Sequence, residues 1–462
     1  MASAADAGRV SQYGGSRAHC ADPRRVVMHL RAAVETLGCK VNQYESSFFQ
    51  ERLEDAGFRI VSFKERADLY LVHGCAVTSR ACYQTRQLLR RAVRTNPDAR
   101  IVAAGCSAQL EGDRYAAEGI ASHVLGTVDK YHLLQWLEKP ADLNRPLVAR
   151  SDPRRSPPLR PLTIGRMLDR RSRAFLKVQD GCNAFCTYCI VPWTRGRSRS
   201  LPLNDAVGQL RRFVSEGYGE VVLSGIHLGQ WGRDLHPPGT LPGLLRACMD
   251  AAGGARLRLS SLEPHEWTDE LLNVLGDSPG VCPHFHVPLQ NGDPKILEAM
   301  GRPYTPDEYA ALVLELRRRF PDAAIGADVL VGFPGESEAR FRNTLELIER
   351  LPLTYLHVFP FSPRPGTPAA GFRDRPHGAA VKRRAEVLRN LGREKRRRFE
   401  AGFVGSRVEV LVESEASPGW LRGTSENYLS VRFAAAAAPP TGARVGVRVE
   451  RTGQQGLIGI ID

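Results

Sequence analysis

Three cysteines stand close together in the middle of the chain: Cys182, Cys186 and Cys189, the central cysteine trio. Thiolates at such short spacings can bind three corners of a cubane iron–sulfur cluster, which leaves the fourth iron open to a ligand that is not protein. A structural zinc site is the main alternative, but zinc would need a fourth Cys or His nearby, and the next cysteine is the distant Cys248. The motif therefore favours a cluster with one open iron.

An open iron could chelate the amino and carboxylate groups of S-adenosylmethionine, and an electron from the cluster would then cleave the sulfonium to give a carbon radical. Tyr188 lies between two of the cysteines, where its ring could stack on an adenine or equally shield the cluster. Ser224 and Gly225 end an apolar run and could offer backbone groups to such a cofactor, although a simple strand-to-helix turn explains them too.

A second set, the N-terminal cysteine trio, consists of Cys39, Cys75 and Cys106. Each follows a glycine, and each ends a largely apolar run that is typical of a buried strand. All three thiols should therefore lie at the carboxyl ends of strands in one sheet, where they would meet in space. Three ordinary buried cysteines are the alternative, but the repeated Gly-Cys pairs favour a second cluster, since glycine lets the backbone approach an inorganic core closely.

The composition is that of a globular protein of about three domains, with 42% hydrophobic and 25% charged residues among 462. No run approaches the roughly 20 apolar residues of a membrane span. Residues 1–29 lack an apolar centre, so we expect a disordered tail, no secretory signal and a monomeric protein in the reducing cytoplasm. There, four ungrouped cysteines are expected to be buried or idle thiols: Cys20, Cys82, Cys248 and Cys282.

The pattern of apolar runs predicts an α/β protein built in three parts. Residues 30–140 alternate strand and helix, which predicts a doubly wound parallel sheet. Residues 141–167 are rich in Pro and Arg and favour an extended linker. Residues 168–399 contain six strand–helix units, which predict a partial (β/α)6 barrel whose reactive groups belong at the carboxyl ends of its strands.

The C-terminal part has a different texture. A basic helix is predicted over residues 381–399, followed over residues 400–462 by four short alternating strands, at 407–412, 428–433, 444–449 and 457–461. This is typical of a small antiparallel barrel that grips oligonucleotides. The net charge of +14 also favours a polyanionic partner.

Two further groups of residues were weighed for chemistry. Arg195, Arg197 and Arg199 follow the central trio and would contact substrate phosphates or form a solvated basic loop. His284 and His286 face the same side of one predicted strand and are interpreted as satisfied core histidines. Neither a Ser/His/Asp triad nor a pair of catalytic carboxylates stands out, so no catalytic residue is assigned beyond the two cysteine trios.

The stretch 180–200, the N-terminal trio and the terminal barrel together resemble the radical S-adenosylmethionine methylthiotransferases, over roughly residues 30–462. Within that family, residues 36–46 (TLGCKVNQYES) resemble the branch that modifies N6-threonylcarbamoyladenosine in tRNA, next to the anticodon on its 3′ side. Two departures are His73-Gly74-Cys75, where the family usually has Asn-Thr-Cys, and the alanine run at 434–438.

The resemblance implies a transferase for tRNA modification that adds a methylthio group to C2 of that nucleoside. It implies two [4Fe-4S] clusters on the two cysteine trios, S-adenosylmethionine, a terminal barrel of the tRNA-binding TRAM type, and two partners, the tRNA anticodon stem-loop and an electron donor protein. It also implies S-adenosylmethionine contacts from Ser261, Glu263 and Asp328, in addition to those suggested above. Isopentenyladenosine in tRNA or a ribosomal protein is the alternative substrate, and a non-catalytic iron–sulfur tRNA-binding protein is the alternative of another class.

Overall fold

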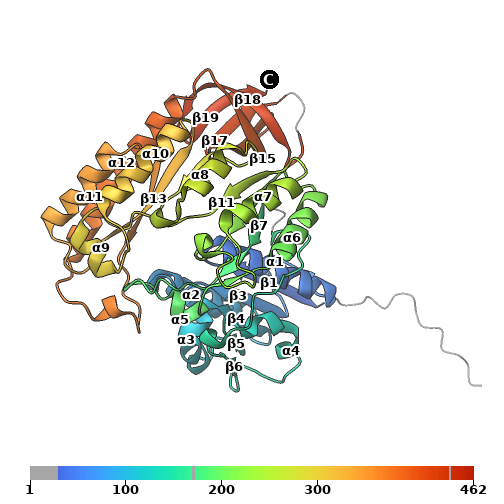
Figure 1. The fold of residues 1–462 in the computed structure, drawn as a ribbon. Helices are drawn as coiled ribbons and strands as arrows, with labels where there is room; N and C mark the ends of the chain where they lie inside the picture. The colour runs from blue at the N-terminus through green and yellow to red at the C-terminus, as the bar shows by residue number, and fades with distance from the viewer. Residues whose placement is uncertain (1–29, 169–171, 436–438, 462) are drawn as a thin grey trace, which may run out of the picture.

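The computed structural model describes residues 30–168, 172–435 and 439–461. The predicted N-terminal tail and Cys20 lie outside the described residues. Figure 1 shows the N-terminal sheet at the bottom, the C-terminal barrel at the top and the central part between them. Among the described residues, no helix combines the length and the apolar composition needed to cross a bilayer.

The N-terminal part is a parallel sheet of six strands in the order β2-β1-β3-β4-β5-β6. Its elements are β1 (Arg31–Thr36), α1 (Lys40–Asp55), β2 (Arg59–Ile60), β3 (Leu69–Gly74), α2 (Ser79–Thr95), β4 (Arg100–Gly105), α3 (Cys106–Ala117), β5 (His123–Leu125), η1 (Asp129–His132), α4 (Leu133–Leu137) and β6 (Leu147–Ala149). Apolar residues of α1 and α4 pack on one face of the sheet and those of α2 and α3 on the other. The predicted doubly wound sheet is therefore confirmed.

The sheet is wider than the sequence indicated. The short strands β2 and β5 carry too few residues to show a periodic pattern. Strand β6 lies in the segment expected to be an extended linker, yet it pairs with β5. A short helix, η2 (Pro153–Arg155), follows it. Backbone pairing thus extends into a stretch whose composition indicated none.

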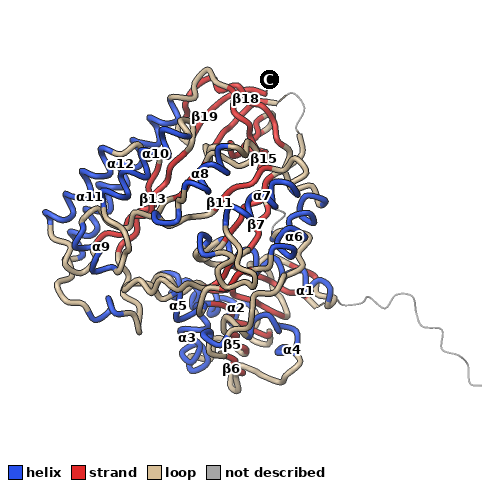
Figure 2. The backbone as a smooth tube through the Cα atoms, viewed as in Figure 1, coloured by secondary structure: helices blue, strands red, loops and turns tan. Residues whose placement is uncertain are grey.

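The central part consists of two parallel sheets of three strands, β11-β10-β7 and β12-β13-β14, joined by a bridge between Leu257 and Val281. Its elements are β7 (Ala174–Lys177), β8 (Gln179–Asp180), α5 (Val191–Arg195), β9 (Arg199–Ser200), α6 (Leu203–Ser215), β10 (Glu220–Ser224), η4 (Leu228–Gln230), α7 (Leu241–Ala251), β11 (Arg256–Leu259), η5 (Pro264–Glu266), α8 (Asp269–Gly276), β12 (His284–His286), α9 (Pro294–Met300), α10 (Pro306–Arg319), β13 (Ala324–Val331), α11 (Glu338–Arg350), β14 (Tyr355–Pro360) and η6 (Pro368–Gly371). One hydrophobic core spans both sheets. Figure 2 shows α10, α11 and α12 together on one side of β13. The six strands form the predicted partial barrel.

The C-terminal part begins with the basic helix α12 (Gly378–Ala401), which is anchored on the central part where Lys395 donates to the Leu351 carbonyl. A closed barrel follows, in the order β15-β16-β17-β19-β18. Its strands are β15 (Arg407–Ser417), β16 (Trp420–Ser425), β17 (Ser430–Ala434), β18 (Arg444–Gly453) and β19 (Gly456–Ile461). The barrel has five strands rather than the four predicted, and β17 and β19 run parallel rather than antiparallel.

Buried charges attach the barrel to the central sheets. Glu220 is fully buried and accepts hydrogen bonds from Arg256 Nε at 2.8 Å and Arg258 Nε at 2.7 Å. The same arginines donate to the barrel carbonyls of Thr424 and Glu426, each at 2.9 Å. Burial alone would raise the pKa of Glu220, but the arginines around it hold that pKa far below its ordinary range.

Candidate active site

The N-terminal cysteine trio lies at one edge of the N-terminal sheet. Cys75 and Cys106 directly follow the neighbouring strands β3 and β4, and Cys39 comes three residues after β1, on the other side of β3. Gly38 has φ +107°, and a Cβ atom there would lie 2.8 Å from the Cβ of Cys75. The three cysteines therefore follow neighbouring strands at one edge of the sheet, as expected, and glycine permits the close approach of Gly38 to Cys75.

The central cysteine trio lies in the loop between β8 and α5. The backbone turns tightly here, since Cys189 N–H donates to the Cys186 carbonyl at 2.9 Å and Phe185 has φ +48°. Two N–H donors point at the sulfur atoms: the backbone of Ala184 at 3.4 Å from Cys182 Sγ, and Arg302 Nη1 at 3.2 Å from Cys186 Sγ. Donors aimed at sulfur stabilise thiolates, which are the form that binds iron.

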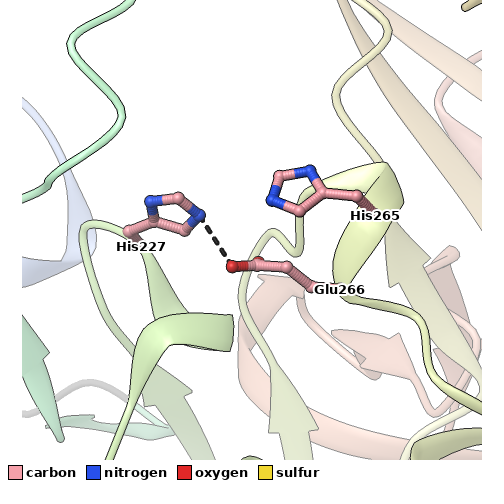
Figure 3. A group of neighbouring side chains, drawn as sticks. All are labelled: His227, His265 and Glu266. Carbon is pink, nitrogen blue, oxygen red and sulfur yellow. Dashed lines mark ion pairs between the residues drawn. The ribbon is translucent and has the colours of Figure 1, made fainter. Parts of the chain in front are cut away.

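A third contact to the central trio comes from His227, whose Nδ1 lies 3.2 Å from Cys182 Sγ. Figure 3 shows its other ring nitrogen, Nε2, facing Glu266, at 2.7 Å from Oε1. Burial opposes protonation of His227, but its contacts with Cys182 and Glu266 raise its pKa to about 9. His227, His265 and Glu266 lie close enough together to hold a metal ion, but Glu266 already accepts from the Glu263 backbone N–H. The group therefore supports the sulfur of Cys182.

Arg195 links the N-terminal trio to the segment before the central trio. The sequence predicted that it would contact substrate phosphates or lie in a solvated basic loop, and both predictions are wrong. Its side chain is only 2% exposed, and its Nε donates to Cys106 Sγ at 3.2 Å. Nη1 lies 2.8 Å from Asp180, two residues before the central trio, while Nη2 contacts Asn42 at 2.5 Å and Glu45 at 3.2 Å. Arg195 is thus neither solvated nor free to bind phosphate, whereas the neighbouring Arg197 is exposed.

A buried charge network surrounds this arginine. Glu45 accepts from Lys130 at 2.6 Å and from Lys177 at 2.9 Å. Burial alone would raise the pKa of Glu45, but Arg195, Lys130 and Lys177 hold it well below its ordinary range. His73 contacts Lys130, and burial and that cation lower the pKa of His73 so that the ring is neutral. Together with Arg199, which lies 3.7 Å from Asp180, four cations therefore face the two carboxylates of Glu45 and Asp180, a surplus of positive charge that suits anionic sulfur.

A cavity of about 1150 Å³ opens beside the N-terminal trio and is lined by Cys39 and Cys75. The other walls come from the central part and from the barrel. His286 and His357 lie 3.0 and 3.3 Å from Asp328 Oδ1 in this wall. His284 donates to or accepts from the Tyr355 hydroxyl at 2.7 Å. His284 and His286 are buried and hydrogen-bonded, as predicted for core histidines. They also line the cavity, so they are not enclosed in the core.

The residues expected to contact S-adenosylmethionine are spread around both trios. Ser261 and Asp328 line the cavity. Glu263 pairs with Arg302, which itself contacts Cys186. Tyr188 packs edge-on against Phe333 at 6.5 Å between ring centres. Ser224 ends β10, and Gly225 lies against Gln179, which accepts from the His227 backbone N–H at 2.8 Å.

The remaining described cysteines lie outside the trios. Cys82 is buried and accepts from Arg364 Nη2 at 3.1 Å, and Cys248 and Cys282 are buried. Cys82 packs with Ala76, Cys106 and Ile190, which follow or belong to the trios. This small apolar cluster thus contacts the chain directly after each trio.

Comparison with known proteins agrees with this arrangement. Residues 31–126 match the profile of the uncharacterized protein family UPF0004, and residues 176–348 match that of the radical SAM superfamily. The solved structure of the radical S-adenosylmethionine methyltransferase TsrM from Kitasatospora setae shares the fold, with a TM-score of 0.52 and 17% identity over 74% of this chain and 77% of that one. The fold and the second profile define a radical SAM protein.

Relatives of known name are similar over nearly the whole chain. The threonylcarbamoyladenosine tRNA methylthiotransferase MtaB of Thermotoga maritima is 36% identical, over 92% of this chain and 95% of its own length. The protein of the same name from Bacillus subtilis is 34% identical over 87% and 90%. The tRNA-2-methylthio-N(6)-dimethylallyladenosine synthase of Moorella thermoacetica is 34% identical over 90% and 95%. The chain belongs to the radical SAM methylthiotransferase family.

Proposed function

We propose that this protein adds a methylthio group to C2 of N6-threonylcarbamoyladenosine in tRNA, next to the anticodon on its 3′ side. The observation that carries the proposal is that the buried Arg195 contacts both Cys106 and Asp180, two residues before the central trio, while Cys39 and Cys75 line a cavity of about 1150 Å³. The substrate follows from the relatives named MtaB, which are 34 to 36% identical over most of the chain.

The donor sets fit two iron–sulfur clusters. Burial raises the pKa of Cys75 and of Cys189 to about 12, so these thiolates need positive charge close by. The central trio would hold one [4Fe-4S] cluster, with His227 and Arg302 donating to its ligands. The N-terminal trio would hold the other, with Arg195 donating to Cys106. When bound, the clusters and S-adenosylmethionine supply the radical and the sulfur that the reaction requires.

The chemistry explains why ordinary side chains are not enough. The C2–H bond of an adenine ring is neither acidic nor open to attack by a base or a simple nucleophile. The chain's own task is therefore to hold the reactants and to exclude water. We assign Ser261 and Asp328, in the cavity, and Tyr188, Ser224, Gly225 and Glu263, around the central trio, to S-adenosylmethionine.

The tRNA would bind across the barrel and the basic helix α12. Arg396 of α12 and Tyr428 of the barrel line the same cavity as Cys39. An RNA held by the barrel could thus present one unstacked base to the N-terminal trio, and single-stranded loops present bases in this way. We further propose that the protein acts as a cytoplasmic monomer and receives electrons from a donor protein.

Nucleoside mass spectrometry tests the substrate. We expect tRNA from cells lacking the gene to lose 2-methylthio-N6-threonylcarbamoyladenosine and to regain it with the wild-type gene but not with Cys186→Ala. Persistence of that nucleoside in the deletion strain would reject the substrate. Loss of the dimethylallyl compound instead would support the second candidate, which the Moorella thermoacetica relative suggests.

A separate assay tests catalysis itself. Anaerobic protein with a reductant should cleave S-adenosylmethionine to 5′-deoxyadenosine, and Cys186→Ala should not. Equal yields from the two proteins would favour a non-catalytic tRNA-binding role.

A further inference from the structure

The cavity beside the N-terminal trio contains a lysine without an acidic partner. Lys40 lines its wall and is the first residue of α1, directly after Cys39. Among the described residues, no ion pair or side-chain hydrogen bond involves Lys40. We propose that Lys40 binds the carboxylate of the threonyl group on the substrate base and thereby sets the preference among N6-modified adenosines. This inference rests on the proposed function and names the residue that would read its substrate.

The other charges of the cavity are already compensated. Arg173 pairs with Glu413, Arg258 pairs with Glu220, and Arg396 pairs with Glu400 at 2.8 Å. On the acidic side, His286 and His357 both contact Asp328. Within the described part of the chain, Lys40 and Arg422 are the cavity cations that lack such a pair. The cavity therefore carries a surplus of positive charge and suits a ligand with an anionic group.

Helix stability does not explain a lysine at this position. The first turn of α1 contains no acidic residue. A cation at the amino end of a helix is disfavoured by the helix dipole, which prefers negative charge there. His284 lines the same cavity; burial is the main cause that lowers its pKa, and Arg258 and Lys40 are among the neighbours that lower it further. Lys40 thus faces the space where a base would bind.

The chemistry of the base places its substituent near the same residue. C2 and C6, the carbon that carries N6, flank N1 in the six-membered ring, so a base that turns C2 toward the N-terminal trio also turns its N6 edge toward that wall. The threonylcarbamoyl group ends in a carboxylate, whereas an isopentenyl group is a hydrocarbon. A lysine in this wall would attract the threonylcarbamoyl carboxylate. Beside an isopentenyl group, its ammonium group would lose water without gaining a polar partner.

Arg422 is assigned a different ligand. It lies on β16 of the barrel and is exposed, which places it at the mouth of the cavity. An exposed arginine on an RNA-binding barrel suits a backbone phosphate, a contact that does not depend on the base modification. It therefore provides the matched control for Lys40.

The test compares two anticodon stem-loop RNAs that differ in one group. One carries N6-threonylcarbamoyladenosine, and the other carries its amide, in which the carboxylate is neutral. Dissociation constants are measured by fluorescence anisotropy on the holoenzyme without reductant, so that no turnover occurs. Lys40→Gln should weaken binding of the first RNA by about 10- to 100-fold and of the amide RNA by less than about twofold. Lys40→Arg, which keeps the charge, should restore most of the difference, and Arg422→Gln should weaken both RNAs equally.

Two results would overturn the inference. The first is an equal loss for both RNAs, or no loss, in Lys40→Gln protein with wild-type iron content. The second is weaker binding of S-adenosylmethionine in equilibrium dialysis with unchanged RNA discrimination, which would assign Lys40 to the carboxylate of the cofactor. If the wild-type protein does not methylthiolate the threonylcarbamoyl RNA at all, the proposed function fails instead.

Discussion

Replacing Arg195 by methionine removes the cation that contacts Cys106 of the N-terminal trio and Asp180, two residues before the central trio. The methionine side chain has a similar length, so the main change is electrostatic. Asp180 would lose its 2.8 Å partner and keep Lys177 at 3.4 Å and Arg199 at 3.7 Å, while Glu45 would keep Lys130 and Lys177. Breaking a buried ion pair by removing one partner costs about 3 to 5 kcal/mol.

That cost is large enough to measure as a shift in thermal stability. In a domain of about 150 to 250 residues, a loss of 1 kcal/mol in the free energy of unfolding lowers Tm by about 2 to 4 °C. Arg195→Met should therefore lower Tm by about 6 to 20 °C. Scanning calorimetry under anaerobic conditions would measure the shift. The Tm of Arg195→Lys should lie between those of the wild-type protein and Arg195→Met. Lysine keeps the charge but lacks the planar guanidinium group with which arginine reaches four partners.

Arg197→Met is the matched control for this substitution. Arg197 is exposed and two residues away. Its replacement should change stability by no more than about 0.5 kcal/mol. If Arg195→Met and Arg197→Met have the same Tm, the buried network does not stabilise the junction between the two cysteine trios, and the electrostatic argument fails.

Three further predictions concern the glycine, the barrel joint and pH. Gly38→Ala should reduce the iron content from about eight to about four per chain, because the new Cβ would collide with Cys75. The control Gly57→Ala, at φ +87° with nothing within 4 Å of the new Cβ, should keep all the iron. Equal iron contents in the two variants would contradict the role of Gly38. Glu220→Gln should cost about 3 kcal/mol and speed hydrogen exchange in β15–β19, unlike Glu216→Gln, whose side chain is 42% exposed; unchanged exchange would show that the barrel docks without this charge. The pKa values of Glu45, Asp180 and Glu220 are lowered in the folded state, so these carboxylates stabilise the fold above the ordinary carboxyl pKa near 4. That stability is lost as the pH falls below about 4, so Tm measured from pH 6 to pH 3 should drop at the acidic end of the range. A Tm that does not change over this range would refute the prediction.

Local patterns predicted most of the fold and the positions of Cys75 and Cys106 directly after buried strands. The apolar runs before Cys75 and Cys106 are buried strands, as expected, because a strand buried on both faces reads as a continuous apolar run. The strand β16 was missed because Gly423 and the charged Arg422 interrupt its alternation. Short strands such as β5 depend on neighbours that are distant in sequence, so the local pattern contains little information about them.

The residues that support the cysteines could not be predicted in the same way. Arg195 begins the basic, turn-rich stretch 195–200 (RGRSRS) and has the sequence context of a surface loop. Its burial depends on Glu45, which lies 150 positions earlier, and on Asp180 from the preceding strand. Pairing over such separations leaves no periodic signal, and a buried arginine is rare enough that the ordinary expectation is exposure. His227 and Arg302 were missed for the same reason.

The two joints of the molecule are built alike. Arg195 bridges the N-terminal and central parts, and Arg256 and Arg258, which pair with Glu220, bridge the central part and the barrel, in each case through buried charges. Buried ion pairs stabilise less than apolar packing of the same volume, but they tolerate little displacement, because a shift leaves charges without partners. A base held by the barrel must reach a sulfur site at the edge of the N-terminal sheet. Joints of this kind would fix the distance between the barrel and that sulfur site more strictly than an apolar interface of the same area.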